Sequence, residues 1–458
     1  MQQMGTQHVM VIPFPAQGHV NPLMSFSKRL TQHGFRVTFV NTDFIHKRVV
    51  SATDEEVNLE GSAVRLVSVP DGLGPMDDRN DLGSLFLAIL RVMPSAIEKL
   101  IRDMNGGSEK ISAIVADLNM AWALEVANEV GVLKGAVFCP CSAAVFALLD
   151  SIPKLIQDGI LNDNGFPIKK GVFQLSPAMP IIMETTNIPW CCIGNTAVQK
   201  TMYDYIRKFM YGAHLTDWWF CNTSSELENG ALSLCSKILP IGPLLMENGD
   251  DQLRSVGQFW KEDLSCLSWL DHQPPCSVIY IAFGSFTVFD PNQLNELALG
   301  LDLTNKPFLW VVREDASGST KITYPDDFKG TRGKIVIWAP QQKVLGHPAI
   351  ACFVSHCGWN STMEGVANGV PFLCWPYFAD QLFDKTYICD EWKVGLGFDL
   401  DEKGLISRWE IKKKVDQLLG DENIRGRSHK LKEMVVRNIA EGGESYKNFI
   451  KFEEWVRK

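Results

Sequence analysis

The first 42 residues combine apolar runs with a stretch of helical periodicity. His8–Phe14 is an apolar run of strand length, and Arg36–Asn41 is a second run, rich in β-branched and aromatic residues. Between them, apolar residues recur at the spacing of a helix face: Leu23, Phe26 and Leu30. Pro22 suits the first turn of that helix, and Gly34 suits its end. The pattern predicts a β-α-β unit with a loop after the first strand.

The alternation continues with strands expected at Ile111–Val115 and Gly135–Phe138, and it restarts near residue 277. The second half has a predicted helix, Asn292–Leu301, among further predicted strands: Ser277–Phe283, Phe308–Val312, Lys334–Ile337, Ala351–Ser355, Pro371–Cys374 and Gly395–Phe398. Strands that alternate with helices favour parallel sheets covered on both faces. We therefore expect an α/β chain with two doubly wound, Rossmann-like domains.

A polar segment with Gly242-Pro243 separates the two halves. We predict an N-terminal domain over residues 1–243, a linker over 244–260 and a C-terminal domain over 261–444. A last helix, at about 445–458 with Ser445 as its cap, carries an apolar stripe: Tyr446, Phe449, Phe452, Trp455 and Val456. We expect this stripe to pack on the body of the protein; a membrane-surface helix is the alternative.

Composition narrows the classes of function. The 458 residues include 44 Lys and Arg against 53 Asp and Glu, a net charge of −9, which argues against a nucleic-acid partner. No apolar run reaches the ~18 residues of a membrane span, and no signal peptide is evident. The 12 cysteines form neither a zinc framework nor a secreted disulfide pattern. We expect a cytoplasmic protein with reduced thiols, without a membrane span, and a monomer.

We look for candidate catalytic residues in the loops after strands, because doubly wound sheets bind ligands there. His19 lies in the first such loop, and a neutral imidazole is a natural general base near pH 7. A hydrogen-bonding surface role is the alternative for a single His. Asp117 follows another predicted strand, so it can lie beside His19 and stabilise the imidazolium. A helix N-cap is the alternative for Asp117.

The segment 351–365 reads as a strand, a tight turn and a helix. Gly358 permits close backbone approach, and Asn360 or Ser361 can cap the helix, whose start would hold a diphosphate. His356 can donate to the same anion. Glu364 completes a capping box with Ser361, or it accepts hydrogen bonds from ribose hydroxyls. The chain lacks GxGxxG after its first strand, GxxxxGK[ST] and GxSxG, which disfavours a nicotinamide oxidoreductase, a phosphate-loop ATPase and a serine hydrolase.

The sequence resembles the plant family 1 UDP-dependent glycosyltransferases of secondary metabolism over essentially its whole length. The most specific part is a 44-residue signature box from Trp338 to Gln381, which contains His356-Cys-Gly-Trp-Asn-Ser361. The start Phe14-Pro-Ala-Gln-Gly-His19 also looks like the family's N-terminal motif. The resemblance implies GT-B architecture: two facing doubly wound domains, the N-terminal one binding the acceptor and the C-terminal one the UDP-sugar, with the last helix crossing back to the N-terminal domain.

The resemblance also implies roles for individual residues. His19 is the base and Asp117 its partner. The donor-binding residues are Ser285, Trp338, Gln341, His356, Trp359, Asn360, Ser361, Glu364, Asp380 and Gln381. Gln at the end of the box is typical of glucose users, which favours UDP-glucose as co-substrate. No cofactor and no metal are implied, and we discount the pair Asp399 and Asp401, the only DxD match.

We therefore predict inverting transfer of glucose from UDP-glucose to a hydroxyl of a small aromatic or terpenoid aglycone, flavonoid or phenylpropanoid in type, to give a β-O-glucoside. Aromatic walls suit flat apolar aglycones, and the candidates for them are Phe14, Met120, Phe146, Trp190, Tyr377 and Phe378. Ordinary core packing is the alternative for these residues. Alternatives for the whole chain are a C- or N-glucosyltransferase of the same family and a catalytically silent nucleotide-sugar-binding protein.

Overall fold

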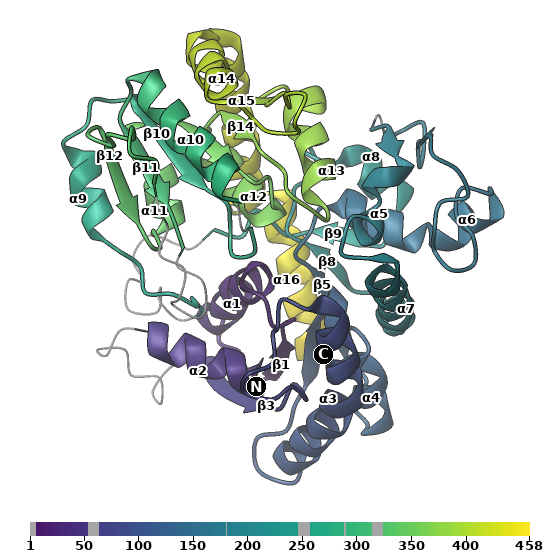
Figure 1. Ribbon diagram of the computed structural model, residues 1–458. Coiled ribbons are helices and arrows are strands. Elements are labelled where there is room, and N and C mark those ends of the chain that lie inside the picture. Colours follow the sequence, from purple (N-terminus) through teal and green to yellow (C-terminus); the bar gives the residue numbers. More distant parts are fainter. Residues whose placement is uncertain (1–5, 54–63, 180, 246–256, 288–289, 314–323) are drawn as a thin grey trace. The chain divides into compact units, whose positions relative to one another are not determined.

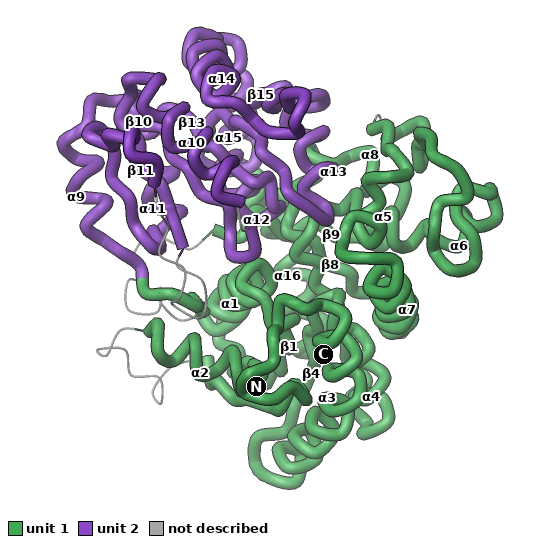
Figure 2. The backbone as a smooth tube through the Cα atoms, in the orientation of Figure 1, with its two compact units in different colours: residues 1–261, 438–458 green, residues 262–437 purple. Residues whose placement is uncertain are grey.

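The computed structural model describes residues 6–53, 64–179, 181–245, 257–287, 290–313 and 324–458. The chain divides into two compact units (Figure 2). The first comprises Met1–Lys261 and Asn438–Lys458, and the second comprises Glu262–Arg437. Each unit is built around its own parallel sheet, so the two are described in turn.

The sheet of the first unit has seven strands in the order β3-β2-β1-β4-β5-β8-β9. All neighbouring strands are parallel, and the order reverses beside β1, which pairs with both β2 and β4. Such a reversal is where doubly wound sheets bind ligands. The strands are β1 His8–Ile12, β2 Arg36–Thr42, β3 Val64–Val69, β4 Ala113–Asp117, β5 Gly135–Cys139, β8 Trp219–Cys221 and β9 Ile238–Pro240, with a separate hairpin of β6 Val172–Phe173 and β7 Met183–Glu184.

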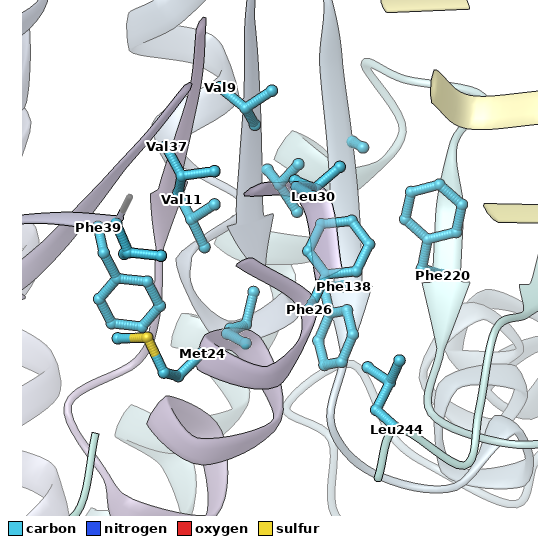
Figure 3. Close-up of a cluster of buried hydrophobic side chains, with 14 of the residues drawn as sticks. Val9, Val11, Met24, Phe26, Leu30, Val37, Phe39, Phe138, Phe220 and Leu244 are labelled. Carbon is cyan, nitrogen blue, oxygen red and sulfur yellow. The ribbon is translucent and has the colours of Figure 1, made fainter. Parts of the chain in front are cut away.

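Helices cover this sheet (Figure 1). Apolar side chains from the strands and from helix α1 meet in one core, which Figure 3 shows around Val11, Phe26 and Phe138. The helices of the first unit are α1 Gln17–Gln32, α2 Asp43–Ala52, α3 Leu82–Asn105, α4 Ala123–Glu129, α5 Ala143–Asp150, α6 Ile152–Gln157, α7 Thr196–Ala213, α8 Asn229–Leu234 and α16 Glu444–Arg457, with short 3₁₀ turns η1 Leu118–Met120, η2 Thr185–Asn187 and η3 Pro189–Cys191.

Helix α1 begins earlier than the sequence predicts. Its N-cap is Ala16, so Pro22 lies inside the helix rather than in its first turn, and His19 belongs to the first turn rather than to a loop. The first N–H group with an α-helical partner is that of Val20, which donates to the carbonyl of Ala16 at 2.9 Å, so a proline placed before Val20 would remove no such bond. Pro22 lies beyond Val20, so the helix gives up one internal bond. Gly34 does follow the helix end, with a positive φ of 84°.

The C-terminal helix α16 packs on the first unit through its apolar stripe. Phe449 and Phe452 are fully buried, and both contact Phe26 of α1, with ring centroids 5.6 and 6.0 Å apart. The expected cap is wrong: Gly443 is the N-cap, and the Ser445 hydroxyl instead donates to the carbonyl of Gly242, 2.7 Å away. That bond ties α16 to the segment after β9.

The second unit has a six-stranded parallel sheet in the order β12-β11-β10-β13-β14-β15. Again the order reverses beside one strand, β10, whose neighbours are β11 and β13. The strands are β10 Val278–Ala282, β11 Phe308–Val311, β12 Gly333–Val336, β13 Ile350–Ser355, β14 Phe372–Cys374 and β15 Gly395–Gly397. The helices are α9 Ser265–Asp271, α10 Pro291–Thr304, α11 Gln341–Leu345, α12 Trp359–Asn368, α13 Gln381–Thr386, the π-helical turn η4 Tyr387–Glu391, α14 Arg408–Gly420 and α15 Glu422–Ile439.

Two further expectations concern the whole chain. None of the helices in the described ranges is long and apolar enough to cross a membrane. All 12 cysteines are free thiols, and seven of them are buried.

Candidate active site

A histidine and a carboxylate meet at the carboxyl edge of the first sheet. Asp117 is the last residue of β4, and His19 lies in the first turn of α1, which follows the adjacent strand β1. His19 Nδ1 is 2.8 Å from Asp117 Oδ2. The aspartate is fully buried, whereas the imidazole is 19% exposed. This geometry fixes the Nδ1 proton toward the carboxylate and leaves Nε2 to accept a proton from outside.

Asp117 makes hydrogen bonds through both of its carboxylate oxygens. Its Oδ1 accepts the backbone N–H of Asn119 at 2.9 Å and so caps the turn η1, while Oδ2 holds His19. One carboxylate can do this because an ionised carboxyl group has about four acceptor sites. Phe14 lies against the imidazole, with ring centroids 5.1 Å apart, and Met120 sits in the capped turn.

In the second unit, the segment 351–365 forms the expected strand, tight turn and helix. Strand β13 ends at Ser355, and α12 starts at Trp359 with Gly358 as its N-cap. The prediction that Asn360 or Ser361 caps this helix is therefore wrong, because both lie inside its first turn. A Cβ at Gly358 would come within 2.5 Å of His356 Nε2, and one at Gly284 within 2.6 Å. Both glycines are needed for the backbone to pass this imidazole.

His356 differs from His19 in its electrostatics. Burial lowers its pKa from 6.5 to about 4, and the charge of Arg313 acts in the same direction. Its Nδ1 is buried without a hydrogen-bond partner among the described residues. The imidazole is therefore neutral near pH 7, and it can act on a ligand as a hydrogen-bond donor rather than as a cation.

Glu364 is held by two glutamines rather than by a capping box. Its carboxylate accepts from Nε2 of Gln341 at 2.6 Å and from Nε2 of Gln342 at 3.1 Å. Gln341 Nε2 also reaches the hydroxyl of Ser361, 2.8 Å away. Burial raises the pKa of Glu364, and the two amide donors oppose that rise. Gln342 was not predicted from the sequence, although its place beside Gln341 in the signature box was a usable signal.

The other predicted donor residues are also in the second unit. Ser285 and Trp338 are half-buried, and so are Asn360 and Asp380. Trp359 is only 2% exposed and packs near Tyr387 and Trp392, so its indole is largely covered by protein.

Gln381 uses its carbonyl oxygen within the protein. Oε1 accepts the backbone N–H groups of Tyr377 at 2.8 Å and Phe378 at 3.2 Å. Both acceptor positions of this oxygen are therefore occupied within the protein, which leaves the NH₂ group to interact with a ligand.

The predicted acceptor wall divides into different environments. Phe14 and Met120 lie beside the His19–Asp117 pair. Phe146 stacks on Trp219 at 4.5 Å, and the indole N–H of Trp190 donates to the carbonyl of Gly165 at 2.7 Å, so both rings have core contacts. Tyr377 and Phe378, in the second unit, have ring centroids 5.8 Å apart, and Tyr377 is 52% exposed.

No group of three or more His, Cys, Asp or Glu side chains within the described ranges is placed to hold a metal ion. The carboxylates of the DxD pair have partners of their own. Asp399 pairs with Lys414 at 3.1 Å, and Asp401 accepts the backbone N–H groups of Lys403 and Leu405.

Comparisons with known proteins agree on one family. Residues 254–431 match the model "UDP-glucoronosyl and UDP-glucosyl transferase", and residues 6–166 match "Glycosyltransferase, N-terminal domain". The chain is 44% identical to UDP-glycosyltransferase 83A1 of Arabidopsis thaliana, over 100% of this chain and 98% of that protein. It is 36% identical to 7-deoxyloganetin glucosyltransferase of Gardenia jasminoides, over 97% and 96% of the two chains.

Among solved structures, Os79 from O. sativa in complex with UDP superposes with a TM-score of 0.80 at 28% identity. The match covers 98% of this chain and 100% of that one. Together with the two parallel sheets, this confirms the predicted fold class, two doubly wound domains of the GT-B type.

Proposed function

The chain belongs to the plant family 1 UDP-glycosyltransferases, and on that premise we propose that it transfers glucose from UDP-glucose to a hydroxyl of a small aromatic or terpenoid aglycone, with inversion, to give a β-O-glucoside. The observation that carries this proposal is the 2.8 Å contact between His19 Nδ1 and the fully buried Asp117. A base oriented in this way is what deprotonation of an acceptor hydroxyl requires.

In the proposed reaction, His19 Nε2 takes the hydroxyl proton as the acceptor oxygen attacks the anomeric carbon. Asp117 stabilises the resulting imidazolium. The bond from the anomeric carbon to the diphosphate oxygen breaks, and UDP leaves with the negative charge. Attack from the face opposite UDP converts an α-linked donor into a β-glucoside.

The donor is assigned to the second unit. The start of α12 offers backbone N–H groups and the positive end of a helix dipole to the diphosphate. Neutral His356 adds a donor, and Glu364 accepts from the ribose hydroxyls. We assign Trp338 to stacking on uracil and Ser285, Asn360 and Ser361 to the diphosphate. The sugar is assigned to Asp380 and the NH₂ group of Gln381, whereas the role of Trp359 stays a prediction because its side chain is only 2% exposed. Gln381 at the end of the signature box is what supports glucose as the transferred sugar.

The acceptor is assigned to the first unit around Phe14 and Met120, beside the base. Phe146, Trp190, Tyr377 and Phe378 stay predictions for the acceptor wall. The curated relative from Gardenia jasminoides is named for glucosyl transfer to 7-deoxyloganetin, which supports both the sugar and a small-molecule acceptor.

The test is a panel of hydroxylated aromatic and terpenoid acceptors with UDP-glucose, UDP-galactose and UDP-glucuronate, read by product mass and by the anomeric coupling constant. His19→Ala should lose at least 100-fold in transfer while UDP still binds. His214→Ala is the matched control, because it removes a solvent-exposed His–Asp pair of the same unit, 3.2 Å from Asp150, and it should be unaffected. UDP binding by the wild type without any turnover would instead favour a nucleotide-sugar-binding protein, and a product resistant to acid would favour C-transfer.

A further inference from the structure

A buried tyrosine on α7 is bonded to the turn that follows Asp117. Tyr205 is 2% exposed, and its hydroxyl donates to the carbonyl of Asn119 at 2.8 Å. The indole N–H of Trp122 donates to the same hydroxyl oxygen at 3.4 Å. Burial raises the pKa of Tyr205, and the nearby charge of Asp117 adds to that rise. The hydroxyl therefore keeps its proton and remains a donor.

Asn119 links this hydroxyl to the proposed base. Its N–H donates to Asp117 Oδ1 at 2.9 Å, and its carbonyl accepts from Tyr205. The other oxygen of Asp117 holds His19 Nδ1 at 2.8 Å. Asn119 therefore supplies one of the two hydrogen bonds of the Asp117 carboxylate, and Tyr205 holds Asn119 in place through its carbonyl.

A series of ring contacts also connects Tyr205 to the same histidine through Phe86 and Phe14. Phe86 of α3 stacks on Tyr205, with centroids 4.4 Å apart and planes 19° apart. Phe86 lies 5.8 Å from Phe14, and Phe14 lies 5.1 Å from the His19 imidazole. The contacts close into a circuit: His19, Asp117, Asn119, Tyr205, Phe86 and Phe14. The aromatic half limits tilting of the imidazole, and the polar half sets the direction of its Nδ1–H bond.

We propose that Tyr205 is a positioning residue for the His19–Asp117 pair: its hydroxyl holds the turn η1 so that Asp117 points at His19 Nδ1, and its ring supports Phe86 and Phe14, which contacts the imidazole. Tyr205 acts through these neighbours and does not touch the acceptor or the sugar. The inference rests on the proposed function, because it assumes that His19 is the base. No feature of the sequence singles out this residue, since α7 is an ordinary amphipathic helix.

The test is Tyr205→Phe, which keeps the ring stack and removes only the hydroxyl. The acceptors are 4-nitrophenol, which loses its proton readily, and 4-methylphenol, which does not. If the base is misdirected, the transfer rate should fall more with the less acidic phenol, which depends more on the base to lose its proton. We expect kcat to fall about tenfold with 4-methylphenol and less than threefold with 4-nitrophenol, with an unchanged KM for UDP-glucose.

Tyr203→Phe is the matched control. Tyr203 lies on the same helix, is 1% exposed and packs near Trp190. Its hydroxyl has no hydrogen bond to η1 among the described residues, so the variant should leave the ratio of the two rates unchanged. A double variant with His19→Ala gives a second measurement. If Tyr205 acts through His19, Tyr205→Phe should cause no further loss of the residual rate with 4-nitrophenol in that background.

The outcomes separate this inference from the proposed function. Unchanged rates in Tyr205→Phe, or equal losses with both phenols, would overturn the positioning role and leave His19 as the base. An additive loss in the double variant would do the same. Full activity of His19→Ala, or no transfer by the wild type to any acceptor of the panel, would instead contradict the proposed function.

Discussion

The two histidines of the proposed mechanism differ in what surrounds the imidazole. His19 faces a buried carboxylate at 2.8 Å, an arrangement that allows it to become positively charged during proton transfer. His356 is half-buried near Arg313, and burial lowers its pKa to about 4. We thus assign a single residue type to the base in one unit and to a neutral hydrogen-bond donor in the other, and the difference comes from neighbours distant in sequence.

The lowered pKa of His356 predicts a loss of stability in mild acid. The folded value, about 4, is below the unfolded value of 6.5, so between these pH values the unfolded chain binds more protons. The stability contributed by neutral His356 is therefore complete above pH 6.5 and declines as the pH falls toward 4. The loss amounts to about 3 kcal/mol if the full shift applies.

Urea unfolding of the wild type and of His356→Gln at pH 7 and pH 4.5 measures this effect. The variant cannot titrate at this position, so its stability should fall less on acidification than that of the wild type. His8, whose pKa is also lowered by burial, titrates in both proteins and cancels in the comparison. Equal losses in both proteins would show that His356 does not stay neutral in the folded state.

Glu364 gives a prediction for nucleotide recognition. Two of its acceptor sites are used by Gln341 and Gln342, which leaves the others for ribose hydroxyls. Glu364→Ala should weaken UDP binding by about tenfold or more, since hydrogen bonds to a charged group contribute about 1.5–3 kcal/mol. Calorimetry with UDP and 2′-deoxy-UDP tests the assignment, because the wild type should prefer UDP and the variant should not. The exposed Glu402→Ala is the control and should keep the preference.

At the scale of helices and strands, the sequence predicts the cores of elements better than their ends. Each predicted strand is present with its ends shifted by at most two residues, because a buried parallel strand requires an uninterrupted apolar run. The predicted helix starts were wrong in three places: Pro22 lies beyond the first turn of its helix, and the N-caps are neither Asn360 or Ser361 nor Ser445. A polar side chain near a helix start has several possible partners, and tertiary contacts decide among them: Ser445 bonds to Gly242, and Ser361 to Gln341.

Close packing of α7 on the turn η1 provides a prediction at this scale. A Cβ at Gly212 would lie 2.2 Å from the carbonyl oxygen of Ala121, a backbone atom that cannot move alone. Gly212→Ala should therefore displace α7 from the segment that follows Asp117, and reduce both the melting temperature and the rate of transfer. Gly426→Ala, in α15, is the matched control: its Cβ meets nothing within 4 Å, so helix propensity should make it neutral or stabilising by up to ~1 kcal/mol. Similar melting temperatures of the two variants would contradict the expected clash.

At the scale of the whole chain, contacts between distant residues set the limit of sequence reasoning. His19 and Asp117 are 98 positions apart, yet their meeting was predictable because both follow strands that end at one edge of the sheet. The position of Tyr205 beside η1 was not predictable, because the packing of α7 on η1 corresponds to no motif in the sequence. The division into an acceptor-binding domain, a linker and a UDP-sugar-binding domain stays a prediction, with bounds at 1–243, 244–260 and 261–444. The compact units of the structure are separated at Lys261 and Arg437.

The assignment of the nucleotide to the second unit can be tested on the intact enzyme by hydrogen exchange. A ligand that binds only the folded state stabilises it by about 2.7 kcal/mol at a concentration 100 times its Kd, and this slows exchange through unfolding about 100-fold. With UDP at that concentration, we expect the largest protection in the segment 355–364, where β13 passes into α12. The segment 113–120, which carries Asp117, should change much less, because the acceptor hydroxyl and not UDP is assigned to it. Protection confined to 113–120 would contradict the assignment. The Glu364→Ala variant at the same UDP concentration should show weaker protection at 355–364, because a smaller fraction of it is bound.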